Sequence, residues 1–255
     1  MSTSTQFSQI GDRRQECSLS DQLLLVAGLV VFAGAFVQGV TGLGFALIVA
    51  PAVGLIDARL LPTLPLLLML PLNFFVAWRE WKAVDVSGAS LIMVGRLVGT
   101  AGGIWLLSSV SLSSLGLIVG ISTILAAAAS LFASPFEPSS HALLAAGAIT
   151  GVTETATGIG GPPMALVYQH RSADVFRPTI ATCFLLGELI SLAVLFTLGR
   201  VEQTVVNTTL LLMPALIAGM LLSSMLHKTI EGRTLRVLVL LFALVSGIVI
   251  TVKSW

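Results

Sequence analysis

Three ionisable side chains, Arg96, Glu154 and Glu188, stand within apolar stretches that carry almost no other charge. A charge in such surroundings costs about 2.5 to 3.5 kcal/mol on an insertion scale, so we expect each side chain to face a cavity or a partner. Arg96 is a candidate to neutralise an anionic substrate; the alternative is a fixed pair with Glu154 or Glu188. The glutamates are candidates to carry a coupling proton, since a buried carboxyl exchanges protons as its surroundings change. The alternative is a structural, hydrogen-bonded carboxyl.

Two glycine-rich polar segments interrupt the longest apolar stretches. Glycine weakens a helix and lets backbone approach a ligand closely. Proline suits the first turn of a restarted helix, whose free N–H groups favour anions. The alternative is that these glycines only permit close helix packing, as expected for the Gly95, Gly99 and Gly103 ladder. The substrate-binding candidates, besides Arg96, are Gln38, Gly39, Thr41, Gly42 and Gly44 in the first segment and Thr157, Gly158, Gly160, Gly161 and Pro162 in the second.

The two segments are copies of each other. Thr41-Gly42-Leu43-Gly44 corresponds to Thr157-Gly158-Ile159-Gly160, 116 positions later, and the same offset places Pro62-Thr63 on Pro178-Thr179. Each Pro-Thr pair is expected to open the next helix. The shared register predicts a duplicated unit.

Other polar and aromatic side chains have structural interpretations. Gln38 lies opposite Glu154 at the same offset, and Asn73 lies near the position of Glu188. Both amides are expected to form interhelical hydrogen bonds. Aromatic residues at the ends of apolar stretches are typical anchors at a membrane interface; here these are Trp78, Trp81 and Tyr168.

The composition excludes a water-soluble fold. Hydrophobic residues make up 56% and charged residues 10% of the chain, whereas soluble domains carry about 25% charged residues. The net charge of +1 provides no basic surface for nucleic acid. The two cysteines match no metal or redox spacing, and no cofactor is expected.

A helix needs about 20 apolar residues to cross a bilayer. Short polar segments divide this chain into eight apolar elements. The elements are Leu23–Ile56, Leu60–Trp78, Ser87–Leu107, Leu112–Ala133, Ala142–Tyr168, Thr179–Leu198, Val205–Met225 and Leu235–Val252. The first and fifth contain the glycine-rich segments and are interpreted as broken helices.

We therefore predict an all-α integral membrane protein of about eight transmembrane elements in two four-element repeats. Residues 1–20 form a polar tail, 21–134 the first repeat and 140–255 the second, with a linker at Ser134–Ser140. The repeats are parallel if every element crosses once and inverted if the broken elements cross twice. Lysines and arginines divide evenly between the two sides, so orientation stays open.

These motifs resemble the sulfite exporter TauE/SafE family of membrane permeases, over nearly the whole chain from about Leu23. The resemblance rests on Gly39-Val40-Thr41-Gly42-Leu43-Gly44 and, more specifically, on Gly151-Val152 and Gly158-Ile159-Gly160-Gly161-Pro162-Pro163. It implies a duplicated four-segment unit that transports small anions, especially sulfite, sulfonates and related compounds, across a bacterial inner membrane. Phe45 stands where the second motif has Gly161, which would narrow the first half of a pocket.

The expected function is a secondary transporter with a midplane site at the two breaks. An anion channel or a carboxylate transporter is the alternative. An intramembrane enzyme is disfavoured because the chain carries no nucleophile motif or zinc-protease motif. No ATP-binding loop is present, so an ion gradient is the expected energy source. Expected partners are a small anion, the lipid bilayer and a second copy of the chain in a homo-oligomer, but no nucleic acid.

Overall fold

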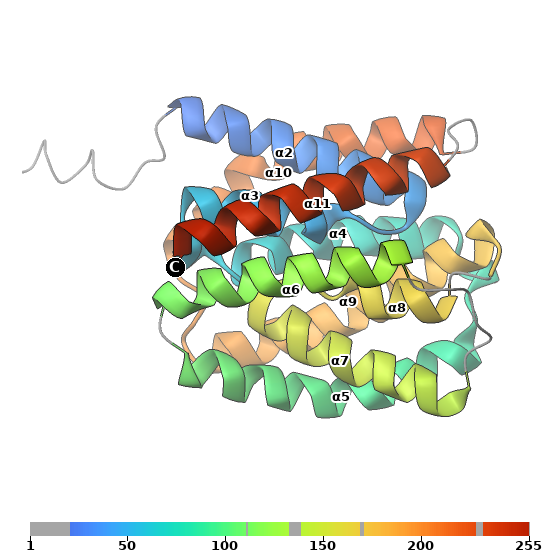
Figure 1. Ribbon diagram of the computed structural model, residues 1–255. Coiled ribbons are helices and arrows are strands. Elements are labelled where there is room, and N and C mark those ends of the chain that lie inside the picture. Colours follow the sequence, from blue (N-terminus) through green and yellow to red (C-terminus); the bar gives the residue numbers. More distant parts are fainter. Residues whose placement is uncertain (1–20, 111, 133–138, 169–170, 228–231, 255) are drawn as a thin grey trace, which may run out of the picture.

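The computed structural model describes residues 21–110, 112–132, 139–168, 171–227 and 232–254, which form helices joined by short turns, with no β-strand (Figure 1). The predicted tail and most of the predicted linker lie outside these residues. Two short 3-10 turns, η1 (Ala58–Leu60) and η2 (Trp81–Ala83), precede α4 and α5. The helices are α2 (Asp21–Thr41), α3 (Phe45–Ile56), α4 (Thr63–Arg79), α5 (Val86–Ser109), α6 (Leu112–Phe132), α7 (Ser140–Thr157), α8 (Gly161–Tyr168), α9 (Ala173–Thr197), α10 (Gln203–Leu226) and α11 (Gly232–Ser254).

The chain reverses direction at each glycine-rich break. α2 ends at Thr41 and α3 runs back beside it, so that a Cβ at Gly34 of α2 would lie 3.0 Å from Val49 Cγ2 of α3. In the second break, Thr150 Oγ1 of α7 donates a hydrogen bond to the Gly160 carbonyl at 3.0 Å. Glycines at the breaks adopt the positive φ that other residues avoid: Gly42 (81°), Gly44 (123°) and Gly158 (78°). Each break is therefore a helical hairpin rather than a kink in one straight helix.

Helices that occupy corresponding places at the 116-residue offset run in opposite directions. α4 and α9 are antiparallel neighbours: Asn73 contacts Glu188 at their centres, and Thr63 at the start of α4 donates to the Arg200 carbonyl beyond the end of α9. α6 and α11 also pack antiparallel to each other (Figure 1). The hairpins account for the opposite directions of corresponding helices, because each hairpin adds one reversal of chain direction to its repeat.

Glycines bring α5 and α7 into backbone contact. A Cβ at Gly99 would overlap the Ala148 carbonyl of α7, and one at Gly103 would lie 2.7 Å from the Val152 carbonyl. From the other side, a Cβ at Gly151 would lie 2.6 Å from the Arg96 carbonyl. The packing role expected for the glycine ladder is confirmed. Because the ladder brings the backbones of α5 and α7 together, it also carries Arg96 of α5 next to the side chains of α7.

The outer faces of the helices are apolar. Leu25, Val98 and Met225 are 69%, 72% and 77% exposed, which a water-soluble protein would avoid in such numbers. Four helices in the described part of the chain are long and apolar enough to cross a membrane: α2 from Gln22, α5, α9 and α10. The charged side chains that cannot face lipid are instead inside the bundle.

One helix start differs from the sequence-based expectation. α9 begins at Ala173, so Pro178 lies inside the helix rather than opening it, whereas Pro62 directly precedes α4 as expected. Pro178 cannot donate to the carbonyl of Asp174 one turn earlier. Separately, the Asp174 side-chain carboxylate pairs with Arg177 Nη2 at 2.8 Å, which ties the first turn together. The residues just before the predicted element Thr179–Leu198 therefore form the first turns of α9.

The interpretation of Tyr168 as an interface anchor is wrong. Its side chain is 2% exposed, and its hydroxyl donates to Asp85 Oδ2 at 3.0 Å. Asp85 caps the start of α5 by accepting from the Gly88 N–H at 3.0 Å. Tyr168 thus fastens the end of α8 to the start of α5. Trp78 and Trp81, by contrast, are 69% and 63% exposed.

Candidate functional site

A buried ion pair joins α5 to α7. Arg96 Nη2 lies 2.5 Å from Glu154 Oε1, and both side chains have no exposed surface. Glycines make room for them: a Cβ at Gly187 of α9 would overlap the Arg96 guanidinium, and one at Gly160 would overlap the Glu154 carboxylate. Of the partners considered for Arg96, the structure places Glu154 in direct contact.

Several polar atoms around this pair are buried without a hydrogen-bond partner in the described part of the chain. They include Arg96 Nε and Nη1, Thr100 Oγ1 and Glu188 Oε2. The Arg96 guanidinium also lies 5.9 Å from the centre of the Phe184 ring, a favourable cation–π distance. Native proteins rarely leave buried donors unused outside functional sites. The guanidinium therefore has free donors to offer a ligand beyond its contact with Glu154.

A row of amides connects the first break to the buried carboxylate of Glu188. The Phe45 N–H donates to Gln38 Oε1 at 3.0 Å, Gln38 Nε2 donates to Asn73 Oδ1 at 2.6 Å, and Asn73 Nδ2 donates to Glu188 Oε1 at 2.7 Å. The interhelical hydrogen bonds expected for Gln38 and Asn73 are confirmed. All three bonds point their donors toward Glu188, which stabilises negative charge on that carboxylate.

The two threonines of the breaks make equivalent local bonds. Thr41 Oγ1 accepts from the Leu43 N–H at 3.2 Å and donates to the Val37 carbonyl at 2.9 Å. Thr157 Oγ1 accepts from the Ile159 N–H at 3.2 Å and donates to the carbonyl one turn earlier at 2.7 Å. These hydroxyls close the turns, so their first role is to hold the shape of each break.

The glycines predicted at the site divide into two groups. Leu43 of the first break lies against Gly161 at the start of α8, so the two breaks touch. Three others pack against different helices: Gly39 against Ser223 of α10, Gly42 against Arg177 of α9 and Gly158 against Pro65 of α4. Pro162 is buried in the first turn of α8, and Gly44 precedes α3. Gly160 and Gly161 therefore lie closest to the buried charges and to the contact between breaks.

Two helix pairs that correspond at the 116-residue offset, α5–α7 and α2–α10, differ in charge. At the 116-residue offset, Arg96 corresponds to Leu212 and Glu154 to Gln38. Leu212 is 1% exposed on α10, which packs on α2 as α5 packs on α7. The α5–α7 pair thus holds an ion pair where the α2–α10 pair holds a leucine and an amide.

Sequence reasoning missed several residues of this region. Thr155 and Ser191 share a hydrogen bond of 2.8 Å beside the ion pair, and Thr100 is one turn beyond Arg96. A signal was present in α9, where Cys183, Gly187 and Ser191 recur every four residues and mark a face of small side chains. That face lies against the buried charges. The described residues contain no group of three or more His, Cys, Asp or Glu placed to hold a metal ion.

Comparison with known proteins gives one match. The family model for the sulfite exporter TauE/SafE matches residues 26–250 of the 255-residue chain. No curated protein and no solved structure matches. The matched segment contains both breaks, the ion pair and the amide row. The chain therefore belongs to the sulfite exporter TauE/SafE family, whose members are multi-pass membrane transporters.

Proposed function

We propose that this protein is a secondary transporter, a permease of small anions such as sulfite, sulfonates and related organosulfur compounds, in a bacterial inner membrane. Its eight apolar elements form two four-element repeats, inverted because each broken first element is a hairpin. The substrate site lies near the midplane, where the breaks meet beside Arg96. The observation that carries this proposal is the fully buried guanidinium with unused N–H donors at Nε and Nη1.

Arginine suits this role chemically. Its planar guanidinium presents pairs of N–H donors that match two oxygens of a carboxylate, sulfite or sulfonate, and it stays charged when buried. In the structure Glu154 Oε1 lies against the Nη2 atom. An incoming anion takes the place of that carboxylate on Arg96, and the same exchange in reverse releases it. Glu154 therefore acts as an internal competitor that keeps the site paired between transport cycles.

Proton coupling follows from the same exchange. When an anion binds Arg96, the released Glu154 carboxylate has no counter-charge and takes up a proton, which compensates the substrate charge. Glu188 is the second proton-carrying candidate, with one carboxylate oxygen held by Asn73 and the other without a partner among the described residues. Both carboxyls contribute to the charge of the site, so the protonation of each affects how well an anion binds.

The two hairpins allow the substrate site to be reached from either side of the membrane. The first break rests against Arg177 at the start of α9, and the second rests against Pro65 near the start of α4. Because α4 and α9 are antiparallel, these supports lie toward opposite ends of the bundle. Displacement of one hairpin opens the site toward one side, and displacement of the other opens it toward the opposite side.

Reconstitution in liposomes tests this function. Wild-type protein should show saturable uptake of sulfite or methanesulfonate that an imposed proton gradient drives above equilibrium. Glu188→Gln preserves shape but removes a titrating group, so accumulation in response to the gradient should fall. Current without saturation would indicate a channel, and saturable flux of acetate but not of sulfite or methanesulfonate would indicate a carboxylate transporter. If neither Glu154→Gln nor Glu188→Gln altered the response, proton coupling through these residues would be refuted.

A further inference from the structure

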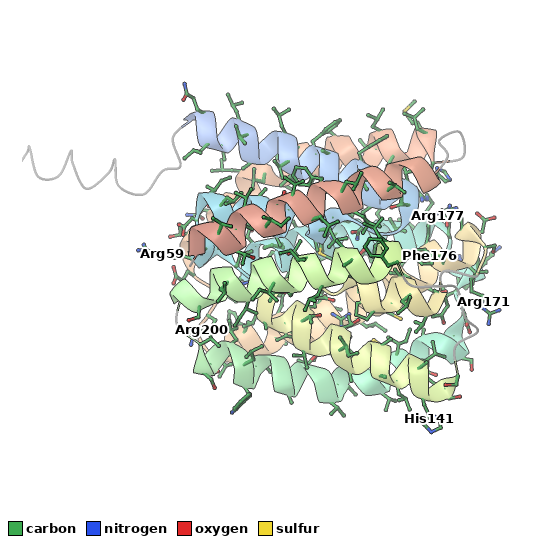
Figure 2. All side chains as sticks on the ribbon, viewed as in Figure 1. Arg59, His141, Arg171, Phe176, Arg177 and Arg200 are labelled. Carbon is green, nitrogen blue, oxygen red and sulfur yellow. The ribbon has the colours of Figure 1, made fainter. Side chains whose placement is uncertain are left out.

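A second charged region lies at one end of the bundle, where α4 ends and α9 begins. It surrounds a surface cavity of about 680 Å³ and is separate from the buried pair. Figure 2 shows Arg177 at this end and Arg59 and Arg200 at the opposite end. The lining residues that matter to the argument are Trp78, Arg79, Glu80, Trp81, Lys82 and Arg177.

Positive charge exceeds negative charge around the cavity. Glu80 accepts from Arg79 Nη2 at 2.8 Å and from Arg177 Nε at 3.1 Å. Asp174 forms an ion pair with Arg177 Nη2, while Lys82 has no carboxylate partner among the described ion pairs. Three permanent cations thus face two carboxylates, and His227 Nε2 stands 4.0 Å from Glu80. Arg79 Nη1 is buried without a hydrogen-bond partner in the described chain.

The same arginines also hold the first break in place. Arg79 Nη2 donates to the Gly39 carbonyl at 3.2 Å, in the last turn of α2. A Cβ on Gly42 would lie 2.9 Å from Arg177 Cα, so the backbone of the break rests directly on that arginine. Glu80 bridges the two arginines and fixes their positions. The charge network and the position of the hairpin are therefore mechanically connected.

We propose that this cavity is an oxyanion-binding site at which the anion replaces Glu80 as the partner of Arg79 and Arg177. Lys82 supplies the third cation, and Trp78 and Trp81 form an apolar wall for an organic substituent. Replacement of the Glu80 bridge frees the arginines to move and loosens the first break. The binding step stands on the geometry of the cavity alone; the view that it admits substrate to Arg96 rests on the proposed transport function.

The ligand of the cavity is an oxyanion, and two kinds of oxyanion can reach this location. A soluble sulfonate can enter from water, and a lipid phosphate can enter from the membrane surface, where exposed tryptophans and cations favour it. Nanodiscs of phosphatidylcholine contain no lipid of net negative charge, so methanesulfonate is titrated against a constant zwitterionic background. Addition of phosphatidylglycerol then shows whether a lipid headgroup competes for the site.

Tryptophan fluorescence reports binding at the cavity. The chain has four tryptophans, so Trp105→Phe with Trp255→Phe leaves only the two that line the cavity. Methanesulfonate should change their emission saturably, with chloride as the ionic-strength control. Lys82→Gln should weaken binding about threefold to fivefold, as expected for a largely exposed charge. Glu80→Gln should tighten binding about tenfold, because a charged competitor for both arginines is removed.

Matched controls separate local effects from general charge effects. Arg59→Gln and Glu202→Gln alter charges outside the cavity and should leave the methanesulfonate Kd unchanged. Hydrogen–deuterium exchange of peptides covering residues 38–45 should increase on methanesulfonate addition. Phosphatidylglycerol competition would support the site with a lipid phosphate as its occupant, and no competition would support a soluble one.

Two results would overturn the proposal. One is the absence of saturable binding, or equal Kd values for wild type, Lys82→Gln and Glu80→Gln. The other is unchanged exchange at residues 38–45, which would refute the connection to the hairpin. The Arg96→Leu/Glu154→Gln protein separates this inference from the transport function, because it should lose transport yet bind methanesulfonate at the cavity as wild type does.

Discussion

The two equivalent helix pairs, α5–α7 and α2–α10, suggest a direct test of the buried ion pair. The α2–α10 pair carries Gln38 and Leu212 at the places that Glu154 and Arg96 occupy in the α5–α7 pair. Changing Arg96→Leu and Glu154→Gln together therefore gives the α5–α7 pair the residue types that the α2–α10 pair already accommodates. We predict that this double variant is folded and inactive in transport, whereas each single variant is less stable than the double.

The magnitudes follow from the burial of both groups. Glu154→Gln leaves the Arg96 cation in the core, and arginine cannot discard its proton, so the loss of stability should approach the 3 to 5 kcal/mol typical of an unpaired buried charge, about 4 kcal/mol. Arg96→Leu leaves a carboxyl, which can take up a proton, so the loss should be nearer to about 1 to 3 kcal/mol. The double variant removes both charges and should lose about 1 kcal/mol, chiefly the contact with Phe184.

The assay is a double-mutant cycle on purified protein in mixed micelles. The free energy of unfolding is measured for wild type, both single variants and the double variant, with Arg59→Gln as an exposed-charge control. The loss in the double variant should be at least about 2 kcal/mol smaller than the sum of the single losses. Additive losses would refute an energetic link between the two residues, and a Glu154→Gln protein as stable as wild type would refute the burial argument itself.

Three further predictions test the surroundings of the site. Gly99→Ala should lower the free energy of unfolding by about 1 to 3 kcal/mol, because its Cβ would meet backbone, whereas Gly28→Ala, with 3.9 Å of clearance, should be tolerated. Gly187→Ala should displace Arg96 and reduce transport by at least about tenfold, with a smaller effect on yield, measured in liposomes. Hydrogen bonds from backbone N–H groups at the start of α5 lower the pKa of Asp85. The ionised carboxylate should therefore stabilise the folded state fully above about pH 4, and this stabilisation should be lost as the pH falls below that value. Asp85→Asn should remove this pH dependence from unfolding curves.

Much of the helical organisation was accessible from sequence because glycine, proline and apolar runs act locally. The positions of the breaks follow from glycines that adopt positive φ at Gly42, Gly44 and Gly158. The reversal at each break was not accessible, since a broken helix and a hairpin need the same residues. The start of α9 was also missed, because Arg177 and Asp174 resemble a charged loop until their i, i+3 pairing is known.

The sequence alone identifies Arg96, Glu154 and Glu188, because a charged residue stands out in an apolar stretch. Which of them form an ion pair depends on how the helices pack. Whether Arg96 meets Glu154 or Glu188 is decided by the glycine contacts that press α5 against α7. Tyr168 was misplaced for a related reason: an aromatic residue at a helix end looks the same whether it faces lipid or Asp85. The cavity beside Arg79 was overlooked, because connector charges are usually solvated and only the fold brings them together.

The amide row makes the relative position of the two halves and the charge state of Glu188 interdependent. Asn73 belongs to α4 and Glu188 to α9, and their hydrogen bond of 2.7 Å is the polar contact between the centres of these antiparallel helices. If α4 moves along α9, that bond breaks and a carboxylate loses its donor inside the bundle, which is costly unless a proton arrives. Conversely, a proton on Glu188 weakens its attraction for the Asn73 donor and makes the displacement easier. We therefore expect movement between the halves and proton uptake at Glu188 to occur together, which a transporter driven by a proton gradient requires.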